Sequence, residues 1–89
     1  MATWRVEIGP EAEEELAVLD RAVYLRVVEK LEWLGRNFSS ISPLLLRYDR
    51  AGEFKLRVGD HRVLYRVKNK HTLFVLKVDH RSRIYKKKK

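Results

Sequence analysis

The fold is decided by one stretch of the sequence, Phe54–Tyr65, which reads FKLRVGDHRVLY. Apolar and polar residues alternate on both sides of Gly59-Asp60, and such alternation is typical of strands with one buried face. Gly-Asp is a two-residue loop suited to a tight hairpin. We therefore expect strands at residues 53–58 and 61–67, paired so that Val58 lies opposite His61. The predicted apolar face holds Phe54, Leu56, Val58, Val63 and Tyr65.

The other face of this hairpin is predicted to be strongly basic. It holds Glu53, Lys55, Arg57, Arg62, Leu64 and Arg66. Arg57 and Arg62 would lie directly opposite each other, a pairing of like charges that costs some tenths of a kcal/mol up to ~1 kcal/mol. Because stability alone would intersperse acidic residues, the clustered cations indicate a site for phosphate. The alternative is a solvated face whose long side chains extend into water.

A third strand, at residues 72–78, is expected to follow a second tight loop at Asn69-Lys70. In this register Arg62 meets Lys77 and Tyr65 meets Phe74. The apolar face then gains Phe74, Leu76 and Val78. The basic face gains Lys77 together with an apolar floor of Leu64, Leu73 and Val75.

The residues before the hairpin predict one strand and two helices. Thr3–Ile8 alternates as a strand does, and Gly9-Pro10 ends it. Glutamates then fill the first turns of a short helix, where the helix dipole favours anions. Asp20 is the predicted N-cap of a longer helix. The apolar face of that helix comprises Tyr24, Val27, Val28, Leu31 and Leu34.

These elements predict an α+β fold of order β-α-α-β-β-β, with two N-terminal helices packed on one face of a mostly antiparallel four-stranded sheet. Arg47–Gly52 is expected to be a loop, and the state of Leu44–Leu46 is left open. Both tryptophans, Trp4 and Trp33, are expected in the core. Residues 1–85 form a single domain, and residues 86–89 are a basic C-terminal tail.

The charge of the chain is unevenly distributed along its 89 residues. Residues 1–40 carry five Lys/Arg and eight Asp/Glu, a net of −3, whereas residues 41–89 carry fifteen and four, a net of +11. Such a one-sided field attracts nucleic acid or an acidic protein. The chain has no cysteine and no apolar run of about 18 residues, and we expect no signal peptide at its start. We therefore expect a cytoplasmic protein with no membrane partner.

The hairpin stretch closely resembles the hairpin motif of the RelE/ParE toxin superfamily. A second match is His80–Tyr85, which is similar to the closing motif of that family. The order of strands and helices also agrees. In the RelE-like branch, the resemblance implies a toxin of a type II toxin-antitoxin system. Such a toxin is a ribosome-dependent endoribonuclease that cleaves mRNA, inhibits translation and needs no metal or cofactor. The implied partners are an antitoxin protein, the ribosome and mRNA.

The resemblance also implies roles for individual side chains in a 2′-hydroxyl transesterification. Lys55 is the candidate base, and His61 and His80 are alternative proton carriers. Arg57 and Arg62 would hold the phosphate, Arg81 would stabilise the leaving oxygen, and Tyr85 would stack on a base. Further contacts to RNA are expected from Lys77, Arg66, Arg83, Lys86 and Lys87.

Two alternatives to the ribonuclease remain open. A ParE-like toxin would inhibit DNA gyrase by protein binding and would need no nuclease site. A catalytically inactive member would bind only its antitoxin or RNA. Glu53 bears on this second alternative, because some active enzymes of the RelE branch carry a lysine at the matching position.

Overall fold

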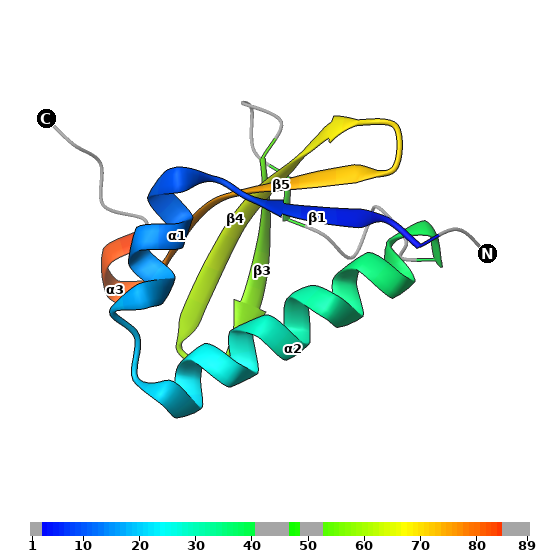
Figure 1. Ribbon diagram of the computed structural model, residues 1–89. Coiled ribbons are helices and arrows are strands. Elements are labelled where there is room, and N and C mark those ends of the chain that lie inside the picture. The colour runs from blue at the N-terminus through cyan, green and yellow to red at the C-terminus, as the bar shows by residue number, and fades with distance from the viewer. Residues whose placement is uncertain (1–2, 41–46, 49–52, 85–89) are drawn as a thin grey trace, which may run out of the picture.

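The structure is a computed structural model that describes residues 3–40, 47–48 and 53–84. Two helices follow the first strand and four strands follow them, with a short helix at the end (Figure 1). The elements are β1 (Arg5–Ile8), α1 (Pro10–Ala17), α2 (Arg21–Asn37), the 3-10 helix η1 (Phe38–Ser40), β2 (Arg47–Tyr48), β3 (Phe54–Val58), β4 (His61–Asn69), β5 (Thr72–His80) and α3 (Arg81–Ile84). The strands form one sheet in the order β1-β5-β4-β3-β2. The pair β1–β5 is parallel and the others are antiparallel. The predicted α+β fold is therefore confirmed.

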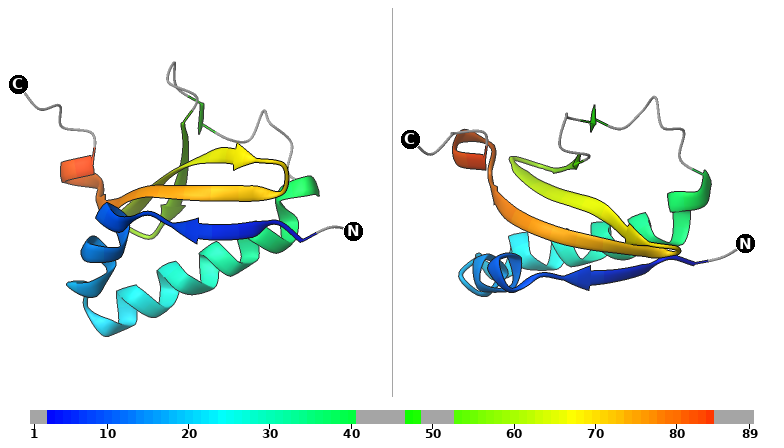
Figure 2. Two further views of the ribbon diagram at one scale, coloured as in Figure 1. Left: turned by 45° about the horizontal axis from the view of Figure 1, so that its top comes forward. Right: turned by 90° about the horizontal axis from the view of Figure 1, so that it is seen from above.

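The two N-terminal helices begin as the sequence predicts. Pro10 occupies the first turn of α1, with Glu11 and Glu13 beside it. The Asp20 carboxylate accepts a hydrogen bond from the Ala22 N–H at 3.3 Å and caps α2. Both helices lie on one side of the sheet (Figure 2). Their apolar residues and those of one sheet face join in a single core. The buried members of this core are Ala12, Leu16, Val27, Leu31, Leu34, Leu56, Val58, Val63, Tyr65, Leu73, Val75 and Val78.

The central hairpin has the register that the sequence predicts. Phe54 pairs with Tyr65 and Val58 with His61, and the pairs between them follow in order. Gly59 takes a positive φ of 59°, which a glycine adopts without strain in a tight turn. The rings of Phe54 and Tyr65 stack with centroids 5.4 Å apart. The apolar face of β3 and β4 therefore packs against the helices as expected.

The predicted register of the third strand of this meander is wrong in two places. The turn is Lys70-His71 and not Asn69-Lys70, because Asn69 pairs with Thr72. A register shift at Val67/Asn69 then leaves Lys68 without a partner residue on β5, and a second shift at Leu64/Tyr65 leaves Leu76 without one on β4. The core consequently contains Leu73 and Val75, where Phe74 and Leu76 were predicted. Val78 lies in the core as expected, because the unpaired Leu76 returns the following residues of β5 to their predicted sides of the sheet.

Both edges of the sheet differ from the expectation. Arg47 and Tyr48 form the edge strand β2 against Lys55 and Phe54, where a loop was predicted. Residues 49–52 and Leu44–Leu46 lie outside the described part of the chain.

At the opposite edge β1 ends at Ile8, so no strand of the described residues lies beside the second half of β5. There Glu15 of α1 takes the place of a strand, because its Oε1 accepts the Val78 N–H at 2.6 Å. Within the described ranges, no helix is long and apolar enough to cross a membrane.

The two tryptophans have different environments. Trp4 packs against the core and lies edge-on to Phe38, with centroids 4.8 Å apart. Trp33 was also expected in the core, but it lies on the outer side of α2 and is 39% exposed. Helical spacing explains the error, because Leu31 and Leu34 already occupy the buried stripe on either side of it.

Candidate nucleic-acid interface

The sheet face opposite the core carries the predicted cations. We call Lys55, Arg57, Arg62 and Arg66 the cation face. Arg57 and Arg66 are exposed, Lys55 is half-buried, and Arg47 pairs with Lys55 across the edge of the sheet. The structure thus brings Lys55 and Arg57 together on one side of β3, because they are two residues apart on one strand.

Arg62 lies opposite Arg57 as predicted, but it does not extend outward. It is only 6% exposed. Its Nη1 donates to the carbonyl oxygens of Gly59 and His61, both at 2.9 Å. The guanidinium therefore satisfies main-chain acceptors of the tight turn, as a planar group with several donors can. The expectation that Arg62 reaches a phosphate in solvent is corrected by this burial.

Lys77 is also placed differently from the expectation. It pairs with Leu64 and not with Arg62, because the turn lies one residue later than predicted and the two register shifts cancel each other at this point. Its Nζ lies 2.9 Å from Glu11 and 2.9 Å from Glu15 of α1. The hydrogen bonds that it donates to Glu15 and then to Glu11 raise its pKa above the ordinary value. Lys77 therefore ties β5 to α1 and does not stand beside Arg57.

The short helix α3 continues directly from β5 and carries two of the predicted residues. The Arg81 N–H donates to the Asp60 carbonyl at 2.8 Å, which joins α3 to the hairpin turn, and the Arg81 side chain is exposed. Arg83 binds Asp79, with Nε 3.0 Å and Nη2 2.8 Å from the same carboxylate oxygen. Burial alone would raise the pKa of Asp79, but hydrogen bonds from Arg83 and the His80 N–H hold it below the ordinary value. Arg81 is thus the more available cation of the two.

The remaining predicted cations and Tyr85 fall into two groups. Arg66 is exposed, and its guanidinium carbon lies 5.4 Å from the centroid of the Phe74 ring. Tyr85, Lys86 and Lys87 lie outside the described residues, and their placement remains a prediction. Phe74, excluded from the core by the register shift, therefore supplies an aromatic surface on the cation face.

The two candidate histidines lie on the core side of the sheet. His61 pairs with His80 across the strands, and their ring centroids are 5.5 Å apart. Burial, followed by the nearby His80, lowers the pKa of His61 below 6.5. His80 Nδ1 accepts the Ser82 N–H at 3.1 Å and so caps the start of α3. Because residues alternate along a strand, both rings face away from Lys55 and Arg57.

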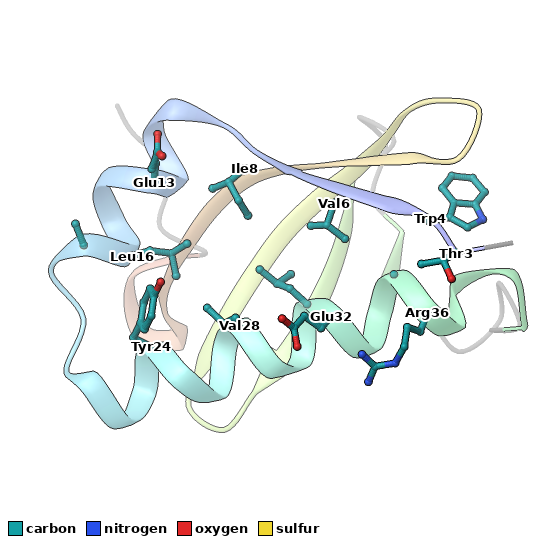
Figure 3. Close-up of a pocket in the computed structure, with 13 residues that line it drawn as sticks. Thr3, Trp4, Val6, Ile8, Glu13, Leu16, Tyr24, Val28, Glu32 and Arg36 are labelled. Atoms are coloured by element: carbon teal, nitrogen blue, oxygen red, sulfur yellow. The ribbon is translucent and has the colours of Figure 1, made fainter.

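A groove on the helix side of the molecule was not predicted. It has a volume of about 670 Å³ and lies between β1, α1 and α2 (Figure 3). Val6, Ile8 and Leu16 form apolar walls, while Glu32 and Arg36 of α2 carry charge beside it. Across the described ranges, no three His, Cys, Asp or Glu side chains are grouped as a metal site requires.

Comparison with known proteins places the chain in a toxin family. A model of the family described as the ParE toxin of the type II toxin-antitoxin system parDE matches residues 6–85. Toxin RelG of Mycobacterium tuberculosis is 46% identical over 43 residues, which are 47% of this chain and 49% of that protein. The chain thus spans about half the length of this curated relative.

Solved structures extend the similarity over most of the chain. The toxin-antitoxin complex RelBE2 of Mycobacterium tuberculosis has a chain that is 30% identical, with a TM-score of 0.74 and coverage of 89% of this chain and 99% of that one. The archaeal RelE–RelB complex of Pyrococcus horikoshii gives 27% identity, a TM-score of 0.70 and coverage of 91% and 98%. The chain therefore belongs to the RelE/ParE family, as a RelE-like toxin of a type II toxin-antitoxin system.

Proposed function

We propose that this toxin is a ribosome-dependent endoribonuclease that cleaves mRNA on its cation face and thereby inhibits translation. The observation that carries the proposal is the joint placement of Lys55 and Arg57 on one accessible side of β3. The exposed Arg81 begins α3 where that helix is joined to the hairpin turn. An array of cations on a sheet with an aromatic ring among them suits a phosphodiester backbone and its bases.

The proposed reaction is a transesterification within the RNA. The 2′-oxygen forms a bond to the adjacent phosphorus, the bond to the 5′-oxygen breaks, and the products are a 2′,3′-cyclic phosphate and a 5′-hydroxyl. Lys55, in its neutral form, accepts the proton of the 2′-hydroxyl. Arg57 donates to the phosphate oxygens, and Arg81 stabilises charge on the leaving 5′-oxygen before it is protonated. Tyr85 is proposed to stack on a neighbouring base.

Arg62 has a different role in this proposal from the one the sequence suggested. Because it donates to Gly59 O and His61 O, it holds the turn that sets the position of Arg57. Arg62 is therefore a positioning residue, and the phosphate contacts fall to Arg57 and Arg81. Additional RNA contacts are proposed for Arg66, Arg83, Lys86 and Lys87, while Lys77 is left out because two carboxylates already bind it.

The proposed protein partner is an antitoxin of the RelB kind, bound in the cytoplasm where the ribosomes are. The solved relatives named above are toxin-antitoxin complexes, which supports such a partner. An acidic segment could fold onto the cation face, with its charges on Lys55 and Arg57 and its apolar side chains on Leu64 and Phe74. Binding there would block RNA directly.

Inhibition of DNA gyrase is the second candidate, because the matching family model is that of the ParE toxin. The two functions are separated by inducing the toxin and mapping mRNA ends in the same cells. Wild type is expected to produce new cuts in phase with codons, and Lys55→Ala to abolish them. Lys70→Ala, the same change in the exposed turn at the far end of β4, is the matched control. Growth arrest with gyrase-linked DNA breaks and no such cuts would contradict the proposal.

A further inference from the structure

A shallow depression lies between α2 and the turn of the central hairpin. Its volume is about 380 Å³. Four residues of α2 and three of the hairpin line it: Arg26, Glu29, Lys30, Trp33, Arg57, Val58 and Gly59. The groove in Figure 3 is bordered by other residues of α2, among them Tyr24 and Arg36, so the depression uses a separate face of that helix.

The depression is cationic and aromatic. Arg26, Lys30 and Arg57 supply three positive charges against the single carboxylate of Glu29, and within the described chain no ion pair joins Glu29 to any of them. Lys30 Nζ lies 4.4 Å from the centroid of the Trp33 ring. The indole is 39% exposed and packs neither within nor against the core cluster. Tryptophan is enriched at binding surfaces, and here its indole lies in one depression with three cations.

The depression is continuous with the cation face through Arg57. This side chain lines the depression and also lies on the outward side of β3 with Lys55. Among the described residues, β2 pairs with Phe54 and Lys55 of β3. Gly59 adds no side chain, and a Cβ built there would meet nothing within 4 Å. A strand of RNA leaving the cation face past Arg57 would therefore reach Trp33 without an obstacle from the hairpin turn.

We propose that the depression binds a nucleotide of single-stranded RNA that flanks the one held on the cation face. Its base stacks on Trp33, and its neighbouring phosphates lie against Arg26 and Lys30. Every base has a π-face, so this contact tolerates any sequence. An acidic peptide would use the cations but has no need of an exposed indole, and this favours RNA. The inference rests on the proposed function in that RNA is the ligand of the adjoining face.

The test measures binding of a short, fluorescein-labelled single-stranded RNA whose 2′-hydroxyls are methylated so that it cannot be cut. Fluorescence anisotropy is recorded over a range of salt concentrations. Trp33→Ala is expected to weaken binding roughly five- to tenfold, and Trp33→Phe much less, since a ring remains for stacking. Arg26→Ala is expected to reduce the slope of log K against log salt by about 0.7. Tyr24→Ala and Arg36→Ala are matched controls on the other face of α2 and should change neither.

The outcomes separate this inference from the proposed function. Equal affinities for Trp33→Ala and Tyr24→Ala would overturn the inference, even if Lys55→Ala abolished cleavage on ribosomes. A chain that never cleaves mRNA, yet loses RNA affinity with Trp33→Ala, would keep the inference and reject the nuclease. Binding of a poly-glutamate peptide that depends on Trp33, with no such dependence for RNA, would overturn the inference in favour of an acidic protein.

Discussion

Replacing Arg62 by methionine removes the guanidinium that serves the turn of the central hairpin and keeps most of the apolar stem. The lost contacts include the two hydrogen bonds at 2.9 Å to the carbonyls of Gly59 and His61. A hydrogen bond to a charged group contributes roughly 1.5–3 kcal/mol. Because Gly59 is exposed, water can replace part of what its carbonyl loses. We therefore expect the free energy of unfolding to fall by about 2–3 kcal/mol in total.

Urea unfolding followed by circular dichroism measures this loss, with Arg57→Met as the matched control. Arg57 is exposed on the opposite strand, so the same chemical change there should alter stability by at most about 0.5 kcal/mol. For a domain of this size, the Arg62 variant should also melt roughly 10–20 °C lower than wild type. Equal losses in the two variants, or a loss below about 0.5 kcal/mol for Arg62→Met, would refute the structural role of Arg62.

Three further results are expected. Glu15→Gln, compared with the exposed Glu14→Gln, should lower the free energy of unfolding by about 2 kcal/mol in urea titrations, because a neutral amide accepts the Val78 N–H less strongly and no longer forms the ion pair with Lys77. Because the pKa of His61 is lowered in the folded state, the unfolded chain binds a proton at a higher pH than the folded chain does. The contribution of neutral His61 to stability is therefore complete above pH 6.5 and is lost as the pH falls below that value. His61→Gln should therefore flatten the rise of stability with pH that thermal melts show as the pH approaches 6.5 from below. Lys55→Ala should lower the cleavage rate far more than the melting temperature, and comparable losses in both would make Lys55 structural.

The central hairpin could be predicted from the sequence because strict alternation and the Gly59-Asp60 loop act together. Neither the alternation alone nor the loop alone fixes which residues of the two strands face each other. Together they predict the observed pairing of Val58 with His61. The register of β5 could not be found in the same way. Residues 73–76 are all apolar, so alternation does not distinguish the core side, and the extra residue at Leu76 leaves no mark in the sequence.

The sequence predicts which side of the sheet carries the candidate site, but not how deeply each side chain is buried. Alternation places Lys55, Arg57 and Arg62 on one side of the sheet, and the pairing confirms this. It says nothing of how far each side chain reaches, and so the burial of Arg62 against main-chain carbonyls was missed. Lys77 was misplaced because its partners lie on α1, which is far away in the sequence. Contacts of this kind depend on how the helices dock.

The central claim is that the accessible cations of β3 catalyse transesterification of ribosome-bound mRNA. It is tested most directly by adding purified toxin to ribosomes programmed with a defined mRNA and analysing the ends of the fragments. Wild type should leave a 2′,3′-cyclic phosphate upstream and a 5′-hydroxyl downstream, and Arg57→Ala should retain the wild-type melting temperature while cleaving more slowly by a factor of at least about 100. Folded wild-type toxin that leaves the mRNA intact, or fragments that begin with a 5′-phosphate, would contradict the claim.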